Sequence, residues 1–139
     1  MPKVAKTAYD MISGMTPELQ VGSFVFVTTN DTALVASFST KAVSTFKEAE
    51  GISMIIPAGL AEKSKLNVDH PMRCITLNVF SSLEGVGLTA AVATALGDHG
   101  IPCNMVAAFH HDHVFVPLEM CDQAMEVLIS LQNCAVKDM

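Results

Sequence analysis

The stretch CITLNVFSSLEGVGLTAAVATALGDHGIPCNMVAAFHHDHVFVP, residues 74–117, decides the fold that we expect for this chain. Its first seven residues, 74–80, alternate apolar side chains with small or polar ones, which predicts a strand with two unlike faces. Residues 86–99 then place apolar side chains at helical spacing and predict a helix. Gly100 stands where a helix often ends in a left-handed cap, and Pro102 prevents the helix from resuming.

The remainder of the stretch predicts how the strands connect. Residues 103–109 and 114–116 have the composition of strands, and a tight turn is expected between them at His110–Asp112. Apolar residues from Met120 to Leu131, at steps of three and four, mark a second helix. A helix between two strands requires a crossover, and a short turn requires an antiparallel pair. The order strand, helix, strand, strand, helix therefore predicts an α+β domain with a ferredoxin-like β-α-β-β-α-β arrangement.

The first half of the chain carries weaker patterns, which lead up to a boundary. The sequence NVDHP, residues 67–71, is polar and contains proline, so we expect it to separate two domains, residues 1–66 and residues 72–139. The elements expected before it are a helix over residues 4–15, a hairpin of strands over 23–29 and 33–38, a strand over 52–56 and a helix over 58–66.

The two halves also resemble each other. SMIIP followed by AGLAEKSKL matches HVFVP followed by LEMCDQAMEVL, which places Pro57 and Pro117 at equivalent positions. Such a strand-proline-helix unit arises either by duplication or by chance. If it is a duplication, the first half is a reduced copy in which the hairpin replaces the long helix of the second half.

Composition and charge exclude several classes of function. The 139 residues include 8 basic and 14 acidic side chains, which give a net charge of −6, and Arg73 is the only arginine. A protein that binds nucleic acid needs clustered Lys and Arg to displace counterions from phosphates, and no such cluster occurs here. Anionic membrane surfaces are disfavoured for the same reason. The longest apolar runs, such as Met54–Ala61, fall far short of the roughly 20 residues that span a bilayer.

The cysteines and the N-terminal residues indicate a reduced, cytoplasmic protein. The cysteines lack the close pairs that a zinc site uses, and a chain of this length folds without metal or disulfides. The start MPKVAKTAYDMISGM has no continuous apolar stretch, so we expect no signal peptide. We also expect no cofactor. The four cysteines are Cys74, Cys103, Cys121 and Cys134.

The sequence GVGLTA, residues 85–90, matches the dinucleotide-binding pattern GxGxxA at the opening of a predicted helix. Three observations disfavour a dinucleotide: residues 81–84 separate the strand from the first glycine, the third strand is expected to be antiparallel, and too few residues follow to complete the fold. A glycine turn at a helix N-terminus still presents free N–H groups to a small anion. The alternative is that Gly85 and Gly87 serve only a tight turn and close packing.

Residues 74–117 resemble an ACT domain, the small module that regulates amino-acid metabolism. The motifs that carry the resemblance are SSLEGVGLTAA, HGIPCN and HDHVFVP, with ELQVGSFVFV and TFKEAEGISMIIP in the first half. More closely, nearly the whole chain resembles a family of small bacterial proteins of unknown function built from tandem ACT-like halves. It is similar as well to the ACT pairs of aspartate kinases and of the cytosolic arginine sensor in animals.

This resemblance implies a ligand site. In ACT domains the loop after the first strand and the start of the first helix hold a small effector, commonly an amino acid. The effector carboxylate would meet the N–H groups at 85–88, while Asn104 and Glu84 read its polar end across an interface between two ACT units. His111-Asp112-His113 departs from the TDY-like phrase of many ACT domains, so the identity of the ligand does not transfer. The candidate ligand-binding residues are Ser81, Ser82, Leu83, Glu84, Gly85, Val86, Gly87, Leu88, Thr89, Asn104 and His113.

We therefore expect a non-catalytic regulatory ACT protein that binds an amino acid, forms a homodimer and signals to a protein partner. The high apolar fraction and the alanine-rich helix faces favour a dimer. One alternative is a small metal-binding protein or enzyme that uses the turn His110–His113, because imidazole and carboxylate groups are metal ligands. Another is an assembly module without a ligand. Ser81-Ser82 lacks the GxSxG context of an activated serine, and no acid–base pair stands out.

Overall fold

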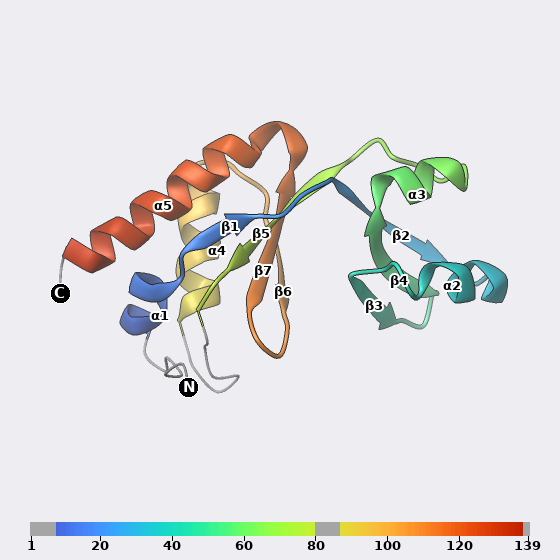
Figure 1. Ribbon diagram of the computed structural model, residues 1–139, viewed down its shortest axis with the longest axis horizontal. Helices are drawn as coiled ribbons and strands as arrows, with labels where there is room; N and C mark the ends of the chain where they lie inside the picture. The colour runs from blue at the N-terminus through green and yellow to red at the C-terminus, as the bar shows by residue number, and fades with distance from the viewer. Residues whose placement is uncertain (1–7, 80–86, 138–139) are drawn as a thin grey trace. The chain divides into compact units, whose positions relative to one another are not determined.

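The computed structural model describes residues 8–79 and 87–137. Its chain forms two compact units (Figure 1). Gly22–Met72 forms one of them, here called the inserted unit. Met1–Val21 and Arg73–Met139, as far as they are described, form the other, here called the split unit. The expected division into 1–66 and 72–139 differs from this one because the described residues before Gly22 belong with the second half.

A short edge strand explains that difference. No strand was expected between residues 15 and 23, but β1 (Pro17–Leu19) pairs antiparallel with β5 (Met72–Leu77). The register joins Glu18 to Thr76. Proline is tolerated as the first residue of an edge strand because the N–H that it lacks is not needed there. The N-terminal segment therefore completes the sheet of the split unit.

The split unit has the α+β, ferredoxin-like architecture that the sequence predicts. Its strands lie in the order β1-β5-β7-β6, and its helices cover one face of this sheet (Figure 1). Ile75 and Leu77 on β5 and Val114 on β7 pack against that layer of helices. The elements besides β1 and β5 are α1 (Ala8–Gly14), α4 (Leu88–Asp98), β6 (Asn104–Ala107), β7 (Asp112–Pro117), the 3-10 turn η1 (Leu118–Met120) and α5 (Cys121–Lys137).

The end of α4 is built as predicted. Gly100 has a φ of 70°, in the left-handed region that glycine enters without steric cost. Its N–H donates to the carbonyl of Gly97 at 2.9 Å, and the N–H of Ile101 donates to the carbonyl of Leu96 at 3.0 Å. These two bonds satisfy carbonyls that the last helical turn would otherwise leave open.

The inserted unit repeats the same order of elements. It consists of β2 (Phe24–Thr29), α2 (Thr32–Phe38), β3 (Ser44–Lys47), β4 (Ile52–Pro57) and α3 (Ala58–Lys63). The strands lie in the antiparallel order β3-β4-β2. Val25, Phe38, Met54, Ile56 and Ala61 are its buried core. Pro57 and Pro117 have nearly the same backbone conformation, with φ and ψ of −56° and 136° against −54° and 140°.

Two predictions for the inserted unit were wrong. Residues 33–38 form the helix α2 instead of the second strand of a hairpin, because the Asp31 carboxylate accepts hydrogen bonds from the N–H groups of Ala33 at 2.9 Å and Leu34 at 3.3 Å. The edge strand β3 was not predicted, since its residues are polar or exposed and show no apolar alternation. The hairpin therefore does not replace the long helix: α2, of seven residues, stands between β2 and β3 as α4, of eleven, stands between β5 and β6.

The β6–β7 hairpin also differs slightly from the expected one. The turn was expected at His110–Asp112, but Asp112 already belongs to β7 and pairs with Ala107. The N–H of Ala108 donates to the carbonyl of His111 at 3.1 Å and closes the turn one residue earlier. The antiparallel pairing itself is confirmed. In the described part of the chain, every helix is too short or too polar to traverse a bilayer.

Candidate functional site

The start of α4 is the predicted anion-accepting position. Gly87 precedes the helix with φ 103° and ψ −23°, a left-handed conformation that a residue with a Cβ adopts only under strain. Its carbonyl accepts the first helical hydrogen bond, from the N–H of Ala91 at 2.9 Å. Gly87 has no side chain with which to cap this end, and the positive end of the dipole of the eleven-residue helix lies behind it.

The residues beside Gly87 divide into those that the structure describes and those that it does not. Leu88 is only 3% exposed and anchors the first turn of α4 in the core, whereas Thr89 is exposed. The other predicted loop residues lie outside the described residues; they are Ser81, Ser82, Leu83, Glu84, Gly85 and Val86.

Asn104 opens β6, as the sequence predicts, and pairs with Phe115. Within one split unit it does not meet Gly87. The helix α4 begins at one end of the unit and runs back to the other, where β6 then starts (Figure 1). A ligand that touches both residues would therefore need Asn104 from another ACT unit.

His113 lies on the face of the sheet opposite to the helices, because its neighbour Val114 points into the core. Its Nδ1 is 2.9 Å from Oγ1 of Thr76. Burial lowers the pKa of His113, a nearby His111 lowers it further, and Asp112 opposes the change. The contact partner of His113 is thus Thr76 on β5, away from the start of α4.

A set of polar side chains surrounds that contact, and the sequence analysis did not find it. We call it the polar row: Glu18, Gln20, Thr76, Asn78 and His113. Gln20 and Asn78 donate hydrogen bonds to the Glu18 carboxylate at 3.0 and 3.3 Å. The alternation of residues 74–80 marked Thr76 and Asn78 as one face. The pairing of β1 with β5 was not predicted, so nothing in the sequence linked Glu18 and Gln20 to Thr76 and Asn78.

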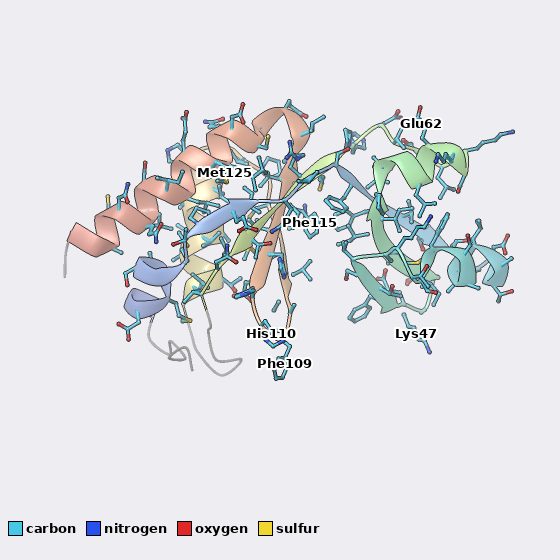
Figure 2. The ribbon with its side chains drawn as sticks, in the orientation of Figure 1. Lys47, Glu62, Phe109, His110, Phe115 and Met125 are labelled. Carbon is cyan, nitrogen blue, oxygen red and sulfur yellow. The ribbon has the colours of Figure 1, made fainter. Side chains whose placement is uncertain are left out.

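The histidines of the β6–β7 hairpin, His110, His111 and His113, each have different contacts. The turn carries Phe109 and His110 at its exposed tip, where their rings meet edge to face with centroids 5.1 Å apart (Figure 2). His111 turns back so that its Nδ1 is 3.3 Å from the carbonyl of Val79. Within residues 8–79 and 87–137, no three His, Cys, Asp or Glu side chains are placed to hold one metal ion. Burial raises the pKa of Asp112, against the opposing effects of His113 and His111.

The inserted unit has a small cavity of about 250 Å³. It is lined by Val25, Phe26, Asn67, His70 and Met72. Its volume is below the roughly 300–1,000 Å³ of ordinary ligand pockets. That volume holds several water molecules, each of which takes about 30 Å³.

Comparisons with known proteins agree with this architecture. Two family models described as an ACT domain match the chain, one over residues 9–73 and the other over residues 69–130. A Vibrio cholerae protein of unknown function, described as a possible transport protein, is 37% identical; the match covers 88% of this chain and 93% of that one, with a TM-score of 0.77.

More distant structures share the fold alone. An Agrobacterium tumefaciens protein is 15% identical, and its match covers 85% of this chain and 89% of that one with a TM-score of 0.67. An aspartokinase with alpha and beta subunits is 13% identical, covering 84% and 97% with a TM-score of 0.61. No curated protein matches the chain.

Proposed function

This chain belongs to the ACT-domain family, with two ACT domains in tandem, and from that premise we propose that it is a non-catalytic regulatory protein that binds an amino acid. ACT domains are regulatory modules for small molecules. The proposed setting is the cytoplasm, where the protein acts as a homodimer, needs no cofactor and passes its signal to a protein partner. The observation that carries the ligand proposal is the start of α4 behind Gly87, a left-handed glycine that has no side chain to cap the helix.

The proposed ligand places its carboxylate on the N–H groups at 85–88. A carboxylate suits this position because the helix end supplies both hydrogen-bond donors and a favourable dipole. Gly87 has no side chain, so the backbone can approach the ligand closely. Asn104 donates and accepts hydrogen bonds, as recognition of an amino acid requires. Because Asn104 and Gly87 lie at opposite ends of one split unit, the proposal assigns Asn104 to a second ACT unit, which a homodimer supplies.

Thermal unfolding against a panel of common L-amino acids tests the proposal. A ligand at 100 times its dissociation constant stabilises the protein by about 2.7 kcal/mol, which raises the midpoint by roughly 5–10 °C. We expect one or two amino acids to do so. Gly87→Val should abolish the rise while circular dichroism shows a retained fold, and Gly97→Ala, in the same helix, should preserve it. A flat panel, or an unchanged response in Gly87→Val, would contradict the proposal.

A further inference from the structure

The sheet face of the split unit opposite to its helices holds a buried hydroxyl. Ile75 and Leu77 point into the core between the sheet and the helices, so Thr76 between them points the other way. Yet Thr76 is only 5% exposed, and it is the one buried polar side chain among the described residues. Buried polar atoms are costly unless they are hydrogen-bonded, and Thr76 is covered by polar partners.

Two amide groups of the polar row use their N–H donors inside it. The Gln20 amide nitrogen donates to Oγ1 of Thr76 at 2.9 Å and to one Glu18 oxygen at 3.0 Å. The Asn78 amide nitrogen donates to the other Glu18 oxygen at 3.3 Å. Each amide therefore turns its nitrogen towards the row and keeps its carbonyl oxygen for other partners. The carboxylate, held from both sides, retains further lone pairs.

Thr76 joins His113 to the rest of the row. Its Oγ1 accepts a hydrogen bond from the Gln20 amide nitrogen at 2.9 Å and lies 2.9 Å from Nδ1 of His113. One ring nitrogen of His113 is therefore engaged within the row, which leaves Nε2 for other partners.

The polar row thus uses its amide donors internally and presents a carboxylate and two amide oxygens as acceptors, with the His113 ring beside them. Its formal charge is −1, because Glu18 is ionised and the lowered pKa of His113 keeps that ring neutral near pH 7. Within the described part of the chain, Glu18 is held by the two neutral amides and makes no salt bridge. Such a surface attracts a cation that brings its own N–H donors.

The inserted unit has the same order of elements without a histidine at the position equivalent to His113. Ser53 stands four residues before Pro57, as His113 stands four residues before Pro117. The hydroxyl of Ser53 donates to the Glu48 carboxylate within the inserted unit, whereas His113 contacts Thr76. A serine is therefore sufficient for the sheet at this position. The imidazole of the split unit is an addition that its architecture leaves unexplained.

We propose that the polar row is a second binding site, which takes a small organic cation with N–H donors, a primary ammonium or a guanidinium. The site is separate from the start of α4, and the proposal stands independently of the amino-acid ligand proposed above. A metal ion is a poorer occupant, since the described residues bring no three His, Cys, Asp or Glu side chains together. An organic cation needs no such shell, because its several N–H donors reach acceptors spread along neighbouring strands.

Nuclear magnetic resonance of the full-length protein tests the proposal, with the ring signals of His113 as the reporter of the polar row. Titration with butylammonium chloride, against sodium chloride at equal ionic strength, should move the His113 ring signals and saturate. Sodium butyrate should not move them. Glu18→Gln should weaken the response at least about tenfold, whereas Glu119→Gln, an exposed carboxylate elsewhere, should not change it.

His113→Ser provides a second variant if Glu18→Gln fails to fold. It installs the residue found at the equivalent position of the inserted unit. We expect it to keep the circular dichroism spectrum and to lose the saturable response of the Gln20 side-chain amide to butylammonium. A response no larger than that to sodium, an equal response in Glu18→Gln, or a response to butyrate would each overturn the proposal.

Discussion

Two glycines near the end of α4 should give opposite results when each is changed to alanine. Gly97 lies inside the helix, and Gly100 follows it with a φ of 70°. A Cβ built on either residue meets nothing within 4 Å. Neither added Cβ would therefore contact the surrounding residues. The two substitutions differ in the backbone conformation at which the Cβ is placed.

The expected free energies follow from that difference. Gly97→Ala removes the backbone freedom that glycine has in the unfolded chain and should stabilise the protein by about 0.5–1 kcal/mol. Gly100→Ala forces a Cβ into the left-handed region and should cost about 1–2 kcal/mol. The hydrogen bonds of Gly100 and Ile101 to the last helical turn use backbone atoms, so both variants retain them. The two variants should differ by about 2 kcal/mol.

Urea and thermal unfolding, followed by circular dichroism, measure this difference. In a chain of this size, 1 kcal/mol moves the midpoint by about 2–4 °C. Gly97→Ala should therefore unfold a few degrees above the parent protein and Gly100→Ala a few degrees below it. If both variants moved the midpoint in the same direction, or if Gly100→Ala left it unchanged, the left-handed cap would not be the feature that ends α4.

Three further predictions concern other parts of the chain. Asp31→Ala removes the cap of α2 and should cost about 1 kcal/mol of stability in urea unfolding; an unchanged midpoint would show that the cap is dispensable. The pKa of His113 in the folded protein is lowered from 6.5, so the unfolded state binds more protons as the pH falls through 6.5 and the free energy of unfolding should decrease there. Urea midpoints measured across this pH range should show the decrease, and His113→Ser should remove it. Cys134 is exposed while Cys74 and Cys121 are buried, so mass spectrometry after thiol labelling of the native protein should find Cys134 modified first, and early labelling of Cys74 would contradict the described burial.

The sequence predicted the elements whose apolar pattern is strong. The strand–proline–helix units at Pro57 and Pro117, the helix before Gly100 and the β6–β7 hairpin are all present. Each combines a regular spacing of apolar residues with a residue that ends the helix or strand. Residues 33–38 lacked such a signal, because an apolar stretch of that length fits a strand or a helix equally well. The Asp31 carboxylate, two residues earlier, decides between them.

The parts that could not be predicted depend on contacts between distant residues. β1 is three residues long and exists because β5 pairs with it. Without that pairing, Glu18 and Gln20 are two polar residues in a loop, and nothing in the local pattern joins them to Thr76 or His113. The start of α4 was predictable from glycines that precede a helix. Predicting that Asn104 lies far from Gly87 would have required knowledge of the direction in which α4 runs in the folded unit.

The insertion of one unit into the other affects how the chain folds during synthesis. β1 leaves the ribosome before its partner strand β5, and the whole inserted unit lies between the two strands in the sequence. The inserted unit can fold as soon as it emerges, and its pairing of Phe24 with Met72 draws its two ends together. That folding shortens the effective loop between β1 and β5 and so lowers the entropic cost of joining them. Folding of the inserted unit thus favours the later pairing of β1 with β5.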